Sequence, residues 1–135
     1  MSRNFAEWLL TFTDSIANYR YYIDFETIYK NAEEYKVELS IQAKEDYKSI
    51  ISYIKYNLLE PNIAEGYAEL IKNEINTLKY NPERFAIIDY DIIKQYKIRK
   101  LIVKKYIVFY RINQDKKIVN IERILYSTTE WKNKI

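Results

Sequence analysis

The chain has 135 residues, of which 48% are hydrophobic and 30% are charged, a composition typical of one globular domain. It contains neither cysteine nor histidine, which excludes disulfide bonds, thiolate metal sites and catalysis by either side chain. Residues 1–34 carry three basic and six acidic side chains, whereas residues 35–135 carry 19 basic and 13 acidic ones. The basic second part suggests an anionic target; the alternative is a basic surface that serves only solubility.

Membrane insertion and export are not indicated by the sequence. No hydrophobic run reaches the roughly 18 residues that a membrane span requires, and no signal peptide opens the chain. We therefore expect a cytoplasmic protein without a membrane partner. No metal ion or other cofactor is expected either.

The first 34 residues are predicted to form a helical N-terminal extension. Asn4 is a candidate N-cap, with Glu7 three residues later, close to a capping box. A second short helix is predicted to start at Asp24. No Gly-, Pro- or Ser-rich linker follows, so we expect the extension to pack rather than to hang free. The first helix carries one strongly hydrophobic stripe at helical spacing, formed by Phe5, Trp8, Leu9, Phe12 and Ile16.

Residues 35–135 are predicted to form the second unit, which begins with a helical hairpin. Hydrophobic and polar residues alternate over Val37–Ile41, which indicates a short strand. Two amphipathic helices are predicted near residues 42–58 and 62–80, with Pro61 between them. Their hydrophobic stripes, which run from Ala43 to Leu58 and from Ile63 through Tyr67 to Leu78, are expected to face the core. Because the connection has only about three residues, the helices must lie antiparallel.

The pattern changes to a period of two after Arg99, which predicts three further strands. They fall at residues 101–103, 106–112 and 118–125, which are rich in β-branched and aromatic residues. Short polar connections between them fit hairpin turns. The order of elements is therefore βααβββ, an α+β domain in which a helical hairpin covers one face of a small, mainly antiparallel sheet.

The second predicted hairpin assigns its side chains to two faces of the sheet. One face is hydrophobic enough to be covered by helices, and the other is mixed. The first face would carry Ile107, Phe109, Val119, Ile121 and Leu125. The second would carry Tyr106, Val108 and Tyr110 beside Asn120, Glu122 and Ile124.

The order of elements and three stretches of sequence resemble the RelE/ParE superfamily of toxins from bacterial toxin–antitoxin pairs. The stretches read VELSIQAKEDYKSIISYIKYNL, then NPERF, then IRKLIVKKYIVFYRINQDKKIVNIERILYSTTEW, and together they span about a hundred residues. The resemblance implies a helical hairpin on one sheet face, an open concave face opposite, and a cognate antitoxin as partner. It also implies one of two targets: the ribosome with its mRNA in the RelE branch, or DNA gyrase in the ParE branch.

The RelE branch cleaves mRNA without a metal, using clustered basic side chains. Lys100 matches one of those basic positions, but Ile98 and Ile107 occupy two others, and Thr128-Thr129 replaces a basic pair. Losing even one group of such a site costs orders of magnitude in rate, so this branch is disfavoured. If the chain is a ribonuclease, the residues implied are Lys100, Arg99, Arg111, Arg123 and Tyr126.

The ParE branch needs only a binding surface and fixes no catalytic group. The candidates for target binding are Arg99, Lys100, Lys104, Lys105, Arg123 and Trp131. Each has a structural alternative. Lysines at a hairpin turn commonly protect a sheet edge, Arg111 and Arg123 would otherwise pair with Glu122 or Asp115, and Tyr106 and Tyr110 fit sheet packing better than base stacking. A third hypothesis is an inactive relative that serves only as an interaction module.

The N-terminal extension resembles a different family. Its stretch NFAEWLLTFTDSIANYRYYIDFETIYKN is similar to the opening helices of restriction endonucleases that recognise GATC, over about thirty-five residues. The catalytic carboxylates of those enzymes lie further downstream and have no counterpart, so no nuclease activity is implied. Residues 1–34 are expected either to pair with a second copy as a homodimer, or to cover the antitoxin site, or to pack passively.

Overall fold

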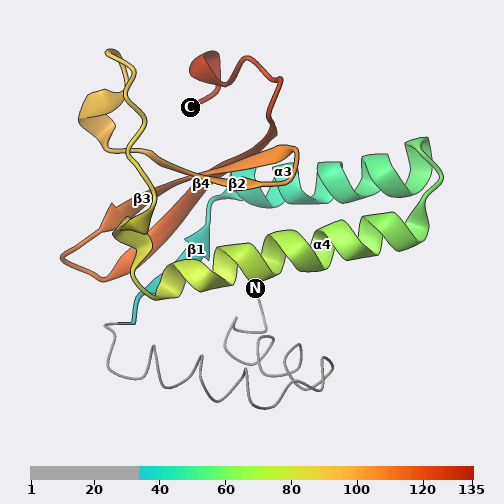
Figure 1. Cartoon of the computed structure of the whole chain (residues 1–135), viewed down its shortest axis with the longest axis horizontal. Helices are drawn as coiled ribbons and strands as arrows, with labels where there is room; N and C mark the ends of the chain where they lie inside the picture. Colours follow the sequence, from blue (N-terminus) through green and yellow to red (C-terminus); the bar gives the residue numbers. More distant parts are fainter. Residues whose placement is uncertain (1–33) are drawn as a thin grey trace.

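The computed structural model describes residues 34–135, and the helices predicted for residues 1–33 lie outside the described part. The described chain forms two layers, a helical hairpin and a four-stranded sheet (Figure 1). The strands are β1 (Lys36–Leu39), β2 (Arg99–Val103), β3 (Tyr106–Asn113) and β4 (Ile118–Tyr126), and the helices are α3 (Ile41–Ser52) and α4 (Pro61–Asn76). This confirms the predicted α+β class and the order βααβββ.

The sheet has the order β1-β4-β3-β2, so the last strand in the sequence lies inside the sheet. β2, β3 and β4 are antiparallel neighbours, while β1 pairs with β4 in parallel, Val37 opposite Val119. A parallel pair needs a crossover connection, and here the helical hairpin and the first two strands of the meander lie within it.

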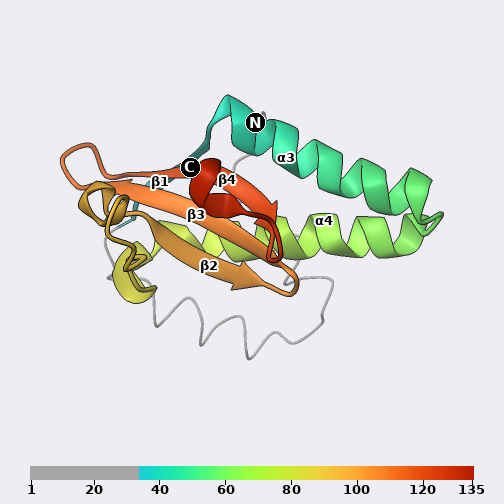
Figure 2. The same ribbon diagram turned by 90° about the horizontal axis from the view of Figure 1, so that it is seen from above.

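The helical hairpin begins with a side-chain cap at Ser40, whose Oγ accepts a hydrogen bond from the Ala43 N–H at 3.0 Å. α3 continues into a π-helical turn at Tyr53–Asn57. Pro61 occupies the first turn of α4, where the backbone N–H that proline lacks would have no partner within the helix. Both helices lie on the same side of the sheet and extend beyond its end (Figures 1 and 2). The extension explains an error of the sequence analysis: Leu58 and Ile63, predicted to face the core, are 52% and 49% exposed.

The main core fills the space between the helices and the sheet. The side chains of Ile71, Ile75 and Leu78 are at most 2% exposed, and Ala43 is completely buried on α3. Fully burying such an aliphatic side chain contributes about 1.5–3 kcal/mol before entropy is counted. The sheet contributes Leu101, Val103, Tyr106, Val108, Tyr110, Val119, Ile121 and Ile124 to this core.

The faces of the β3–β4 hairpin differ from the prediction because of a β-bulge between Phe109 and Tyr110. Before the bulge Phe109 lies opposite Arg123, and after it Tyr110 lies opposite Ile121. An extra residue in one strand exchanges the faces of everything beyond it. Val119 and Ile121 therefore join Tyr110 beneath the helices, instead of Phe109 as predicted.

The sheet face opposite the helices is also covered, and the open concave face implied by the resemblance is not observed. Phe109 is completely buried there, and Ile107 and Leu125 are each 8% exposed. Two segments cover them: the connection between α4 and β2, and the C-terminal residues that follow β4 (Figure 2). This second core consists of Ile88, Tyr90, Ile93, Ile98, Ile107, Phe109, Leu125, Trp131 and Ile135. Among the described helices, none has the length and hydrophobicity needed to cross a membrane.

Candidate functional site

Three exposed basic side chains lie on β2 and on the turn that joins it to β3. Lys104 and Lys105 form the turn itself, and Lys104 has a positive φ of 56°. Lys100 lies opposite Phe109 on β2, so it belongs to the sheet face away from the helices. On the same strand and face, Ile102 is 62% exposed. The structure thus brings Lys100, Lys104 and Lys105 together on one edge of the sheet, beside an exposed isoleucine.

Arg99, the first residue of β2, binds backbone groups of a neighbouring segment. Its Nη1 donates to the carbonyl oxygens of Glu83 at 3.0 Å and Phe85 at 2.5 Å. In register beside it, the Tyr110 hydroxyl donates to the Pro82 carbonyl at 2.6 Å. Burial raises the pKa of Tyr110 to about 12, against the opposing effect of the Arg99 and Arg84 charges. Arg99 therefore holds the segment that follows α4 in place. Nη1 of its guanidinium is used for these two hydrogen bonds.

Arg123 forms a partly buried ion pair with Asp46 that joins β4 to α3. Nε and Nη2 donate to the two carboxylate oxygens at 2.7 and 2.9 Å, and Nη1 donates to the Lys134 carbonyl at 3.1 Å. The side chains of Arg123 and Asp46 are only 17% and 13% exposed. The hydrogen bond to Asp46 raises the pKa of Arg123. The partner predicted from the sequence, Glu122 or Asp115, is wrong for Arg123, because the guanidinium pairs instead with Asp46, which is 77 residues away in the chain.

Arg111 and Trp131 lie on the covered face. The Arg111 guanidinium is exposed and lies 6.0 Å from the centre of the Tyr96 ring. Trp131 is half-buried, with its ring 5.4 Å from Phe109 and 6.4 Å from Tyr90. Trp131 thus attaches the C-terminal segment to the second core, and only part of its ring is available to a partner.

Tyr126 belongs to a tyrosine cluster at the end of the sheet. The ring centres of Tyr106 and Tyr126 are 5.5 Å apart, and Tyr67 of α4 lies 5.8 Å from Tyr106 on the other side. Burial raises the pKa of Tyr106, and the neighbouring Tyr67, Tyr126 and Tyr53 raise it further. Tyr67 was predicted from the sequence as part of the hydrophobic stripe of its helix, whereas Tyr53 was not singled out, because only the fold brings it to Tyr106. Both predicted packing tyrosines, Tyr106 and Tyr110, are buried in the sheet.

The five residues implied for a ribonuclease do not form one cluster. Arg99 and Arg123 are held by Glu83, Phe85 and Asp46 as described above, while Arg111 and Tyr126 lie toward opposite ends of the β3–β4 hairpin, beside Asn120 and Tyr106. Lys100 remains exposed between them. Within residues 34–135, no group of three or more acidic side chains is placed to bind a metal ion.

Comparison with known proteins identifies the family and adds one partial match. Residues 37–131 match the family described as the ParE toxin of the type II toxin–antitoxin system, parDE. A stretch of 81 residues is 38% identical to the type II restriction enzyme DpnII of Streptococcus pneumoniae, covering 60% of this chain and 24% of that enzyme. The chain thus matches about a quarter of the enzyme's length. The matched stretch of 81 residues is longer than the thirty-five residues inferred from the sequence. It therefore extends beyond residues 1–34.

A solved structure from a toxin–antitoxin system shows the same fold. The chromosomal ParDE system from P. aeruginosa superposes with a TM-score of 0.58 at 16% identity, covering 70% of this chain and 98% of that chain. The RelBE2 toxin–antitoxin complex from Mycobacterium tuberculosis gives a TM-score of 0.49 at 18% identity, covering 69% and 91%. Since the family match runs from β1 to the C-terminal segment and takes in well over half of the residues, the chain belongs to the ParE toxin family of type II toxin–antitoxin systems.

Proposed function

We propose that this toxin acts by binding a macromolecular target without chemistry of its own, and that the target is DNA gyrase. The binding surface is the β2–β3 edge with Lys100, Lys104, Lys105 and Ile102. These three lysines form no ion pair within the described residues, and Ile102 is 62% exposed. Exposed cations beside an exposed aliphatic side chain suit an acidic partner surface with a hydrophobic centre.

The covered sheet face is the observation that carries this choice against mRNA cleavage. Ile98 and Ile107 stand where the RelE branch has basic groups, and they are 5% and 8% exposed within the second core. An mRNA phosphate could bind on that face only if the segments that cover the face were displaced. A ribonuclease also needs several cations aimed at one phosphate, and the engaged Arg99 and Arg123 argue against such a site.

A cognate antitoxin is the second proposed partner. The structures of similar fold come from toxin–antitoxin systems, ParDE in one case and RelBE2 in the other. We propose that the antitoxin neutralises the chain in the bacterial cytoplasm, and that free toxin inhibits growth. Its basic edge, with Lys104 and Lys105 exposed, favours an antitoxin with an acidic segment.

Two assays on the purified full chain test the target. The first measures supercoiling by gyrase, and the second maps mRNA cuts in a translating extract. We expect inhibition of gyrase and no cuts. Replacing Lys104→Glu and Lys105→Glu together should raise the concentration for half-inhibition at least about tenfold, because close charge pairs across interfaces couple by about 1.5 kcal/mol or more. The matched control, Lys44→Glu with Lys48→Glu on exposed positions of α3, changes the net charge equally and should leave inhibition unchanged.

Three results would overturn the proposal. Ribosome-dependent cuts abolished by Lys100→Ala would show a ribonuclease. Equal loss in both double variants would show that only net charge matters. A chain that binds antitoxin but affects neither gyrase nor translation would be an inactive relative.

A further inference from the structure

The N-terminal segment joins the fold beside the C-terminal end of α4. The Tyr35 N–H donates to the Lys79 carbonyl at 2.8 Å, and Glu34 forms an isolated antiparallel bridge with Tyr80. The Glu34 carboxylate also lies 3.5 Å from Lys79 Nζ, and the Lys79 side chain is only 8% exposed. Residues 1–33 therefore start from a fixed point next to α4.

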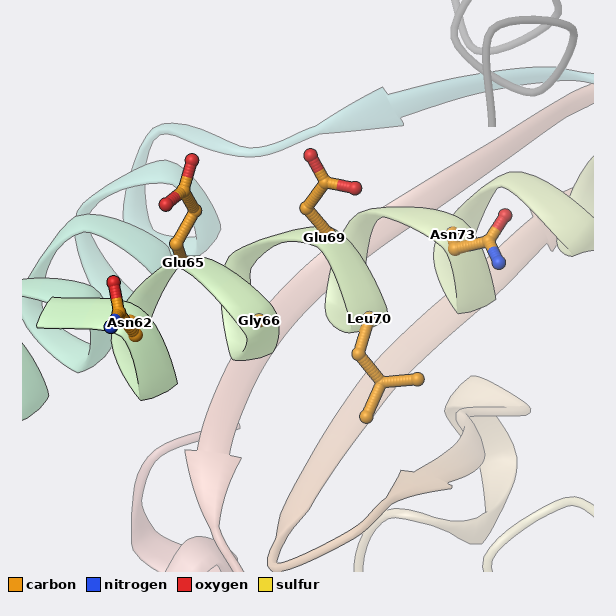
Figure 3. A pocket seen from close by; sticks show the side chains of 6 residues that line it. All are labelled: Asn62, Glu65, Gly66, Glu69, Leu70 and Asn73. Carbon is orange, nitrogen blue, oxygen red and sulfur yellow. The ribbon is translucent and has the colours of Figure 1, made fainter. Parts of the chain in front are cut away.

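The outward face of α4 carries an open hollow of about 610 Å³. Ile63, Gly66, Leu70 and Asn73 follow one another at spacings of three and four, so they lie along one stripe of the helix. Figure 3 shows the side chains of Glu65 and Glu69 pointing to one side of this stripe and Leu70 to the other, with Gly66 between them. The hollow is lined by Asn62, Glu65, Gly66, Glu69, Leu70 and Asn73.

Gly66 is the single glycine of the chain, and the described residues give no local reason for it. Its φ is not positive, and no heavy atom of the described structure lies within 4 Å of the position that a Cβ would take. Glycine inside a helix costs about 0.8–1.0 kcal/mol relative to alanine. A glycine on an outward helix face permits close approach by another element, which the described residues do not supply.

Buried amide groups lie further along α4, toward the point where the N-terminal segment joins. Asn76 is completely buried, and neither its Oδ1 nor its Nδ2 has a hydrogen-bond partner in the described part of the structure. The Oδ1 of Asn73, one turn earlier, is buried and unpartnered in the same way. Burying an amide without a partner costs about 1–3 kcal/mol in proteins. Of these two residues only Asn73 lines the hollow, so its Oδ1 is the unpartnered atom that a donor from a segment seated there would reach.

We propose that the outward face of α4 is the docking surface for the chain's own N-terminal segment, whose hydrophobic stripe packs over Gly66 and Leu70. The predicted stripe from Phe5 to Ile16 would span about 17 Å as a helix, and α4 spans about 24 Å. The 17 residues between Ile16 and Glu34 reach up to about 56 Å when extended. The stripe can therefore return along α4 from the fixed point at Tyr80 and cover Gly66. This inference is independent of the target proposed above.

Tryptophan fluorescence tests the docking in the full chain, which has only two tryptophans, Trp8 and Trp131. In a Trp131→Phe background, acrylamide should quench Trp8 several-fold less than in the chain unfolded by urea. Gly66→Leu meets open space in the described structure, so it should leave α4 helical while blocking close approach. We expect it to return the quenching of Trp8 to the unfolded value. Lys48→Leu, at an exposed position of α3, is the matched control and should change nothing.

A second measurement avoids any change in the hollow itself. The chain has no cysteine, so a single Glu69→Cys carries a nitroxide label specifically at the rim. The label should quench Trp8 strongly, whereas the same label at Lys48→Cys should not. Three outcomes overturn the proposal: Trp8 already fully quenchable in the parent, Trp8 insensitive to both Gly66→Leu and the Glu69 label, or protection of Trp8 that disappears on dilution. The last outcome would assign the stripe to a second copy of the chain.

Discussion

The Arg123–Asp46 pair gives the sharpest prediction about stability. The Asp46 carboxylate accepts three hydrogen bonds, two from Arg123 and one from the Ile124 N–H at 2.9 Å. Removing one partner of a buried ion pair costs about 3–5 kcal/mol, because the other charge stays buried and uncompensated. Because this pair is partly buried, with side chains 17% and 13% exposed, we expect Asp46→Ala to lower the free energy of unfolding by about 3 kcal/mol, the lower end of that range and still a large part of the roughly 5–15 kcal/mol of an ordinary domain.

Urea unfolding followed by far-UV circular dichroism measures the loss, provided that the slope with denaturant is unchanged. The control is Glu38→Ala, which removes an exposed pair with Lys36 whose side chains are 45% and 73% exposed; exposed pairs contribute about 0–1 kcal/mol. The double variant Asp46→Leu with Arg123→Met should recover most of the loss, because a hydrophobic replacement of a buried pair is often neutral. A cost for Asp46→Ala no larger than that for Glu38→Ala would refute the structural role of the pair and return Arg123 to the candidates for target binding.

Three further predictions concern the cores and the loop between the helices. Burial raises the pKa of Tyr110 to about 12, so its stabilising contribution, present below the ordinary pKa of about 10, should be lost between about pH 10 and 12; Tyr110→Phe should reduce the fall in urea stability over that range, while Tyr47, whose pKa is also raised to about 12, keeps part of it. Phe109→Ala in the second core should cost about 3–5 kcal/mol and expose Trp131 to acrylamide before global unfolding. Leu59 is 77% exposed with a φ of 54°; its left-handed backbone costs about 1–2 kcal/mol and the entropy of glycine takes back about 0.5–1 kcal/mol, so Leu59→Gly should raise stability to thermal unfolding by about 1 kcal/mol or less.

The elements could be predicted from the sequence because their signals are local. Ser40 and Pro61 mark the starts of the two helices, and the change of hydrophobic period marks the strands. The face assignment failed at the bulge between Phe109 and Tyr110, since a shift of one residue leaves no mark in an already hydrophobic run. The exposure of Leu58 and Ile63 was missed for a related reason: helix periodicity does not show where the sheet ends.

The candidate surface could be predicted only in part. The adjacent Lys104 and Lys105 were identified because a turn places neighbours together and exposes them. The engagement of Arg99 and Arg123 could not be foreseen, because their partners Phe85 and Asp46 are distant in sequence. The second core was missed because its cover includes Ile88 and Ile93, which lie in a connection without a regular hydrophobic period.

The position of β4 inside the sheet has a consequence for synthesis of the toxin. β4 separates β1 from β3, and the Ser40 hydroxyl donates to the Glu122 carbonyl across 82 residues of sequence. Folding that depends on such distant contacts is slow and cannot finish while the later strand is still unmade. A nascent chain that has not yet reached residue 118 lacks the strand that joins its first half to its second. We therefore expect products of interrupted translation to be harmless to the cell that makes them, and toxicity to begin only once the last strand has left the ribosome.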